Sequence, residues 1–256
     1  MKVLAALDET SVARPVLAAA HEIAPLFAAD VVAVHVVQDG VEGVRELADG
    51  AHVPLTELEG PPGARLAQAL EDDDVLALVV GTARADGRRE IGSTALAVVT
   101  TAQKPVFAIP PELPAGFAVH RLLVPLEGSL PTAFAPHAAL DASAAAHVEV
   151  VILHVLEEDA LPAFSDQPQH EWEAFGREFL TRYCRWPLER VRLETRVGRP
   201  DQLILPVAQE MDCDLIVLAW AQELAPGRAN IVRETLRGGR IPIMLVPVKA
   251  AVPAGA

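Results

Sequence analysis

The chain has 256 residues, of which 51% are hydrophobic and 22% charged, and its formal net charge is −14. This length suits two domains of ordinary size, and the composition is that of a chain that folds throughout. A strongly negative surface repels phosphate backbones and anionic lipids, so we expect neither nucleic acid nor membrane as a partner.

The first predicted element is a strand over Val3–Leu7, because continuous apolar runs are typical of parallel strands covered on both faces. Two acidic residues follow it directly. The run is therefore too short for the apolar core of a secretory signal, and we expect a cytoplasmic protein. Thr10 or Ser11 is expected to cap a helix over Val12–Phe27, which carries apolar residues at helical spacing.

Further strands and one further helix follow in the first part of the chain. The predicted strands are Val31–Val37, a weaker candidate at His52–Leu58, Leu76–Val80 and Val106–Ile109, with a helix over Ala64–Leu70. Strands that alternate with helices predict right-handed crossovers and a parallel sheet with helices on both faces. No uncharged stretch reaches the roughly 20 apolar residues of a spanning helix, so we expect no membrane segment.

The chain repeats itself. Lys2–Thr10 matches Arg121–Ser129, and Val31–Val37 matches Val150–Leu156 at the same offset. Later blocks recur in the same order, although the second copy gains a segment between them. We therefore expect a first repeat at 1–117, a second repeat at 118–248 and a tail at 249–256, with the Pro-rich linker Pro110–Gly116 before the boundary. The predicted fold is α/β, with two tandem doubly wound parallel sheets of five strands each.

Several conspicuous residues are interpreted as packing. The extra segment of the second repeat holds an aromatic stripe at helical spacing, which is typical of a core-facing helix. Its members are Trp172, Phe175, Phe179, Tyr183 and Trp186. His35 and His154 recur inside apolar runs, which favours hydrogen-bonded core histidines over ligands or bases. Cys184 and Cys213 lack metal-ligand spacing and are expected to be reduced, structural thiols.

Four short motifs resemble those of the universal stress protein family: Asp8–Ser11, Val34–Val37, Gly60-x-Pro62, and Gly92-Ser93 before a helix. The resemblance spans nearly the whole chain, twice. It implies an adenine nucleotide α-hydrolase-like fold and a role in the stress response. It also implies that the two final strands, Val106–Ile109 and Ile243–Val246, pair across a pseudo-twofold axis, so that one chain imitates the family's dimer. A further homodimer is an open alternative.

For nucleotide-binding members, the resemblance implies an aspartate after strand one and a Gly-x2-Gly-x9-Gly-Ser/Thr loop after strand four. Glycines let the backbone approach phosphate, and N–H groups at a helix N-terminus attract anions. We therefore expect the first repeat to bind ATP or a related adenine nucleotide, with Mg²⁺ accompanying it. The candidate contacts are Ala6, Leu7, Asp8, Val36, Val37, Gly81, Thr82, Arg84, Gly87, Gly92, Ser93 and Thr94.

Both repeats depart from this loop pattern. In the first repeat Arg84 replaces the second glycine, and the loop to Gly92 is two residues short. The arginines of the loop either offset phosphate charge or form a solvated surface. In the second repeat Ala219 and Trp220 stand where a glycine and a small residue are expected, so we predict that it binds no nucleotide.

Three functions follow from the sequence. The leading hypothesis is a stress-response protein with adenine nucleotide in the first repeat. The alternative is an interaction module that binds no nucleotide and works through protein contacts or another small ligand. A weaker third is a ligase or adenylyl transferase of the wider superfamily. The sequence contains no hydrolase, zinc-protease or P-loop motif and shows no evident general base, so any ATPase activity is expected to be slow.

Overall fold

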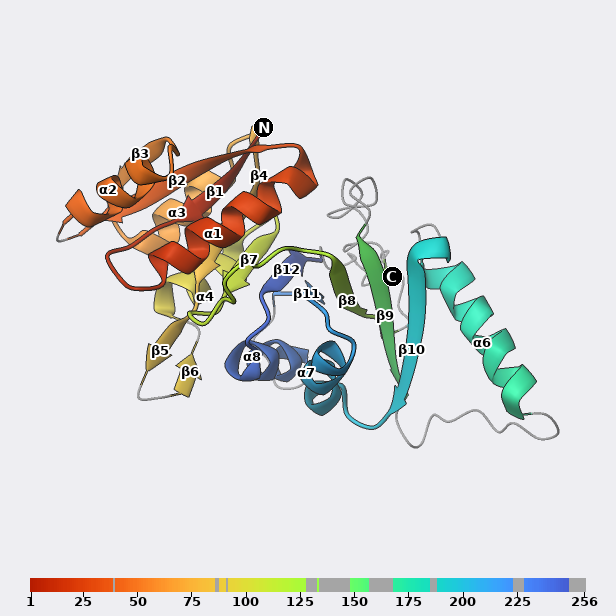
Figure 1. Cartoon of the computed structure of the whole chain (residues 1–256). Helices are drawn as coiled ribbons and strands as arrows, with labels where there is room; N and C mark the ends of the chain where they lie inside the picture. Colours follow the sequence, from red (N-terminus) through yellow and green to blue (C-terminus); the bar gives the residue numbers. More distant parts are fainter. Residues whose placement is uncertain are drawn as a thin grey trace, which may run out of the picture.

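Ten strands form one sheet in the part of the chain that the computed structural model describes, and two short strands form a separate hairpin (Figure 1). The described residues are 1–38, 40–85, 88–90, 92–127, 133, 148–156, 168–184, 188–222 and 228–248. No helix within these ranges has the length and hydropathy needed to cross a membrane.

The first repeat alternates strands and helices in the predicted order, and the weak third strand is present. Its elements are β1 (Lys2–Ala6), α1 (Ala13–Ile23), the 3₁₀ helix η1 (Ala24–Phe27), β2 (Asp30–Val37), α2 (Glu42–Gly50), β3 (Leu55–Glu59), α3 (Pro62–Leu70), β4 (Val75–Gly81), β5 (Ala83–Ala85), β6 (Arg88–Glu90), α4 (Ser93–Thr101) and β7 (Val106–Ile109). The short strands β5 and β6 were not predicted.

The predicted cap of α1 is wrong. The residue before the helix is Val12, and no side chain caps it. Thr10 is held two residues further back, because its N–H and its hydroxyl both donate to Asp8 Oδ1, at 3.0 and 2.6 Å. The Thr10 hydroxyl accepts only a long bond, 3.3 Å, from the Val12 N–H. The tight turn after β1 therefore uses Thr10 to fix Asp8 instead of to begin the helix.

The second repeat follows the same plan with one longer helix. Its described elements are β8 (Arg121–Pro125), β9 (Glu149–Leu156), α6 (Pro168–Tyr183), the 3₁₀ helix η3 (Leu188–Arg190), β10 (Val191–Val197), α7 (Pro200–Glu210), β11 (Leu215–Trp220), α8 (Arg228–Gly238) and β12 (Ile243–Pro247). Helix α6 lies between the second and third strands, where the first repeat has the shorter α2, so the extra segment extends this connection.

The two halves join edge to edge into one sheet. The strand order is β10-β9-β8-β11-β12-β7-β4-β1-β2-β3, and pairing is parallel within each half. At the junction β12 and β7 pair antiparallel, with Met244 opposite Phe107 (Figure 1). The predicted pairing of the two final strands is confirmed. Antiparallel pairing of equivalent strands relates the halves by an approximate twofold axis.

Helices cover both faces of the sheet, as a doubly wound fold requires. Buried side chains of α1 and α2, with Phe179 of α6, pack on one face. Those of α3, α4, α7 and α8 pack on the other. Phe107 at the junction is fully buried, and its ring meets Phe27 edge-on at a centroid distance of 6.0 Å.

Residues of the second repeat also contact α4 of the first. The Gln222 side-chain amide donates to the carbonyls of Val99 and Ala102, at 3.1 and 2.6 Å, so it satisfies carbonyls at the end of α4 that lack helical partners. Trp220 is buried beside the same two residues. Its indole thus packs between the repeats.

The residues interpreted as packing are buried or partly buried where the structure describes their side chains. Phe179 is only 5% exposed, and Phe175 and Tyr183 pack partly buried against the same core. The side chain of Trp172, and Trp186 as a whole, lie outside the described residues. Cys184 and Cys213 are both buried, which agrees with the prediction of structural thiols.

Candidate ligand-binding site

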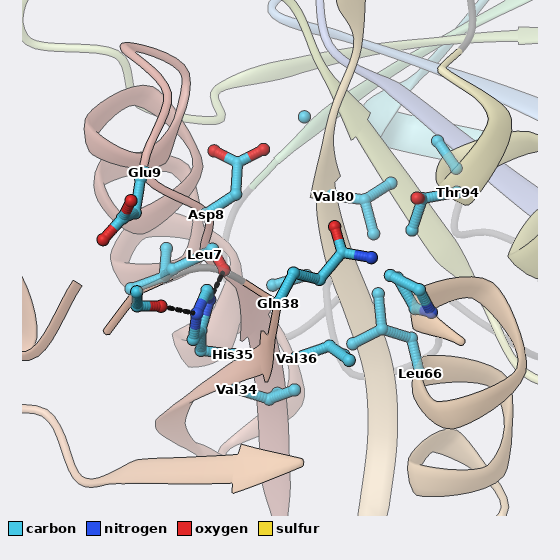
Figure 2. Close-up of a pocket in the computed structure, with 15 residues that line it drawn as sticks. Leu7, Asp8, Glu9, Val34, His35, Val36, Gln38, Leu66, Val80 and Thr94 are labelled. Atoms are coloured by element: carbon cyan, nitrogen blue, oxygen red, sulfur yellow. Dashed lines mark hydrogen bonds between the residues drawn. The ribbon is translucent and has the colours of Figure 1, made fainter. Parts of the chain in front are cut away.

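A cavity of about 290 Å³ lies at the carboxyl ends of β1, β2 and β4 in the first repeat. The sheet order reverses between β1 and β4, and ligands of doubly wound sheets bind at such a point. The lining residues are Ala6, Leu7, Asp8, Glu9, Val34, His35, Val36, Gln38, Gly40, Pro62, Leu66, Val80, Gly81, Thr94 and Ala95. In Figure 2, Glu9 and His35 lie on one side, Thr94 and Leu66 on the other, and Asp8 and Gln38 between them.

The cavity brings together half of the predicted contact residues. Ala6, Leu7, Asp8, Val36, Gly81 and Thr94 line it, whereas Val37, Thr82, Gly92 and Ser93 do not. Thr82 is buried, and both its N–H and its hydroxyl donate to the carbonyl of Ile109. The side chain of Arg84 and the whole of Gly87 lie outside the described residues. That these twelve residues contact a bound nucleotide stays a prediction.

Two carboxylates line the mouth of the cavity. Asp8 is fixed by its two bonds from Thr10, and within the described chain both go to Oδ1. Its Oδ2 can therefore accept hydrogen bonds from a ligand. The Glu9 carboxylate lies so close to Gly40 that a β-carbon there would come within 2.5 Å of Oε1. The β2–α2 connection therefore lies directly against the Glu9 side chain, which is exposed and can move.

His35 ties that connection to the sheet. The ring is 5% exposed, and its Nδ1 lies 2.9 Å from the carbonyl oxygen of Leu7, while Nε2 lies 2.8 Å from that of Gly40 (Figure 2). A neutral imidazole has one N–H and can donate to only one of these oxygens, whereas the protonated ring donates to both. The prediction of a hydrogen-bonded core histidine is confirmed, and the ring also forms part of the cavity wall.

The opposite wall is the first turn of α4. Thr94 and Ala95 lie there, after Gly92 at the N-cap position. Backbone N–H groups in the first turn of a helix lack carbonyl partners within it and favour negative charge nearby. This end of the cavity is therefore the electropositive one, and the Asp8 and Glu9 end is electronegative.

Gly81 has a packing role that was not predicted from the sequence. A β-carbon at Gly81 would lie 2.4 Å from Val12 Cγ1 and 3.4 Å from Val16 Cγ2. The glycine therefore lets α1 pack closely on the end of β4, whatever binds beside it. The equivalent Ala219 of the second repeat carries the β-carbon that this packing excludes.

The expected phosphate-wrapping loop contains a hairpin. Strands β5 and β6 pair antiparallel, with Arg84 opposite Arg89, and β6 packs against α8 of the second repeat. The sequence signal is the Asp86-Gly87 dipeptide, a pair favoured in two-residue hairpin connections. The expectation of a simple loop from Gly81 to Gly92 is therefore corrected.

Sequence reasoning missed lining residues from the ends of other elements. Gln38 and Gly40 follow β2, and Pro62 and Leu66 belong to α3. The topology carries a signal for them, because the carboxyl ends of parallel strands meet at one edge of the sheet. Among the described residues, no group of three or more His, Cys, Asp or Glu side chains is placed to hold a metal ion. Bound Mg²⁺ stays a prediction.

Fold and cavity together define the class: a two-repeat, doubly wound α/β protein with a cavity at a topological switch point of its first half. The model of the Universal stress protein family matches residues 118–247, which is half of the chain. The chain belongs to the universal stress protein family. None of the curated proteins matches its sequence.

Solved structures show the same two-repeat fold. A universal stress protein from Archaeoglobus fulgidus has a TM-score of 0.69 at 14% identity, covering 96% of this chain and 98% of that one. A protein of unknown function from Pseudomonas aeruginosa PAO1 has a TM-score of 0.68 at 13% identity, covering 96% and 92%. A putative universal stress protein from P. aeruginosa UCBPP-PA14 has a TM-score of 0.66 at 13% identity, covering 96% and 93%.

Proposed function

We propose that the chain is a cytoplasmic stress-response protein whose first repeat binds an adenine nucleotide in the cavity at the ends of β1, β2 and β4. The position of this cavity at the reversal of strand order carries the proposal. Six of the twelve residues that the family resemblance implies as contacts line it.

The cavity suits the nucleoside part of such a ligand. Its volume of about 290 Å³ is at the lower end of the ~300–1,000 Å³ of pockets for drug-sized molecules. Leu66, Val36 and Val80 offer an apolar wall for the base, and Asp8 Oδ2 can accept from ribose hydroxyls. We place the phosphates at the first turn of α4, away from Glu9.

Charge predicts which adenine compounds bind best. The described lining has two carboxylates and no Lys or Arg. Affinity should therefore rest on the adenosine part, and a triphosphate should need Mg²⁺ to offset its charge. Any hydrolysis is expected to be slow, because the sequence offers no evident general base.

We assign the second repeat a supporting role. It extends the sheet through the β7–β12 pairing and holds α4, whose first turn forms one cavity wall, through Gln222. In this proposal one chain serves as the intramolecular counterpart of a dimer, and further association into a homodimer is compatible with it.

The test identifies the small molecules that co-purify with the protein and measures which adenine compounds it binds. Molecules released from the purified, denatured protein are analysed by ultraviolet absorption and mass, and adenosine, AMP and ATP with Mg²⁺ are titrated by calorimetry. Release of an adenine compound, or saturable binding of at least one of the three, supports the proposal. Absence of both at millimolar ligand contradicts it.

One observation favours the alternative, an interaction module. Residues 83–85 and 88–90 form a hairpin that packs on α8 instead of wrapping a phosphate chain. If no adenine compound binds, this second candidate replaces the first, and the ligand or protein contact must then be sought by other means.

A further inference from the structure

The histidine on the second strand of each repeat has a different set of contacts in the two repeats. In both, Nδ1 lies 2.9 Å from the carbonyl oxygen of the residue that follows the first strand, Leu7 for His35 and Leu126 for His154. Only His35 has a second contact among the described residues, because its Nε2 lies 2.8 Å from the carbonyl oxygen of Gly40 (Figure 2). The Gly40 contact is therefore an addition to an arrangement that both repeats share.

The shared contact indicates which nitrogen carries the proton when the ring of His35 is neutral. A carbonyl oxygen only accepts hydrogen bonds, so Nδ1 must carry a proton to bind the carbonyl of Leu7. This contact is buried, and a buried oxygen left without a donor is costly. The contact with Gly40 is only partly buried, so water can replace it. The neutral ring is therefore expected to keep its proton on Nδ1 and to leave Nε2 bare.

A bare Nε2 cannot hold the carbonyl of Gly40. Both atoms would then be acceptors, and their lone pairs repel each other at a separation of 2.8 Å. A second proton on Nε2 turns the ring into an imidazolium, which donates to both carbonyl oxygens. Histidine side chains gain or lose this proton between about pH 5 and pH 8. The arrangement with both contacts is therefore that of a protonated ring.

The charges nearest to the ring of His35 favour its protonated form. The carboxylates of Asp8 and Glu9 line the same cavity as the ring. On the neighbouring strand β3, Glu57 is the register partner of His35, and its carboxylate pairs with Arg45 of α2. Carboxylates near an imidazole stabilise its charged form.

The other charged residues on this side of the sheet leave that balance unchanged. Those of the two helices that pack on this face are exposed to solvent, where water and salt screen them: Arg14, His21 and Glu22 of α1, and Glu42, Glu46 and Asp49 of α2. Asp39, next to Gly40, lies outside the described residues.

We propose that His35 is a proton-controlled anchor of the connection between β2 and α2. In acid, the ring donates to the carbonyls of Leu7 and Gly40 and holds this connection against the cavity wall. When Nε2 releases its proton to solvent, the bond to Leu7 stays, and the carbonyl of Gly40 turns to water. The cavity at the ends of β1, β2 and β4 is then wider, and its wall has lost one positive charge. This anchor does not depend on which ligand the cavity binds.

The first test determines where the protons of the ring lie in the wild-type chain. Long-range proton–nitrogen NMR spectra of the full chain are recorded at about pH 5 and about pH 8. We expect both ring nitrogens of His35 to carry protons at the lower pH, and Nδ1 alone at the higher pH. A proton on Nε2 alone at the higher pH would overturn the proposal, because the neutral ring would then hold Gly40 by itself. The same protonation state at both pH values would also overturn it.

The second test measures how firmly the connection is held. The N–H of Arg45 donates to the carbonyl of Val41 at 2.9 Å, at the start of α2, so its hydrogen exchange reports on this segment. After correction for the intrinsic exchange rate, its protection is expected to be at least about tenfold lower at about pH 8 than at about pH 5. The reason is that a hydrogen bond from a charged donor is lost. Equal protection at both pH values contradicts the proposal.

Two matched variants assign the effect to one ring. His35→Phe is expected to give low protection of this segment at both pH values, so that the pH dependence disappears. His154→Phe, in the second repeat, should keep the pH dependence of the wild type. A pH dependence that persists in His35→Phe would overturn the proposal. Failure of adenine compounds to bind would leave all these expectations as they stand, so this proposal and the proposed function fail separately.

Discussion

The two repeats share a fold but use equivalent positions differently. In the first repeat, the ring of His35 reaches the carbonyl of Gly40 and forms part of a cavity. In the second, the ring of His154 packs on Phe179 at a centroid distance of 4.2 Å. One long helix therefore brings an aromatic core to a place where the other repeat admits a ligand-sized space. A shared strand pattern sets the fold, and a few inserted or exchanged side chains decide what the ends of the strands can do.

The largest expected effect is on the core of the second repeat. Phe179→Ala should lower its free energy of unfolding by about 3–5 kcal/mol, because a buried aromatic ring is lost from between His154 and Tyr183. Urea unfolding followed by tryptophan fluorescence measures this directly, since all three tryptophans belong to the second repeat. Phe179→Leu should cost less. A loss below about 1 kcal/mol for Phe179→Ala would contradict the aromatic core.

A paired substitution of the two histidines comes next. His35→Phe removes the ring that lies within hydrogen-bond distance of the carbonyl oxygens of Leu7 and Gly40, and the lost hydrogen bond should cost roughly 1–3 kcal/mol. His154→Phe removes the partner of the Leu126 carbonyl, the one hydrogen bond of this ring among the described residues, and keeps an aromatic ring beside Phe179. The measurement is chemical denaturation followed by far-ultraviolet circular dichroism. If His154→Phe lowers the free energy of unfolding as much as His35→Phe or more, the two histidines do not differ in their structural role.

The smallest expected effect is a pH dependence at Cys213, which occupies the place of Val75. Burial raises the pKa of this thiol from 9.0 to about 11, although the nearby Arg121 opposes the shift. The folded protein thus holds the proton more tightly than the unfolded chain, so this stabilisation is complete below pH 9 and disappears as the pH rises to about 11.

The matched variant is Cys213→Val, the residue of the first repeat. Thermal unfolding between pH 8 and 11 should show a steeper fall in the melting temperature for the wild type than for Cys213→Val. Parallel curves for the two proteins would show that the thiol does not titrate in this range.

The sequence predicted the sheet well because the repeat and the continuous apolar strands are local signals. The pairing of Val106–Ile109 with Ile243–Val246 followed from the family resemblance and is confirmed. The hairpin of residues 83–85 and 88–90 was not predicted, because Gly87 was interpreted only as a phosphate-loop glycine. The role of Gly81 could not be predicted either, since its contact with Val12 depends on how closely α1 approaches β4.

The cavity also could not be predicted from the sequence, because it depends on how separate helices and strands pack. The cavity at the ends of β1, β2 and β4 is lined from several elements, for example by Gln38 after β2 and by Leu66 of α3, which only the folded chain brings together. Likewise, the family model matches residues 118–247, the repeat that departs further from the phosphate-loop pattern. Such a match reports the shared strands and helices, whereas ligand binding depends on a handful of side chains at their ends.

The most direct test of this account is the stoichiometry of adenine nucleotide binding in a matched pair of variants. Asp8 and Glu127 follow the first strands of the two repeats. In calorimetric titrations with AMP and with Mg²⁺–ATP, we predict one site per chain, weakened at least about tenfold by Asp8→Ala and unchanged by Glu127→Ala. Two sites per chain, or a loss of affinity in Glu127→Ala with none in Asp8→Ala, would contradict the assignment of binding to the first repeat.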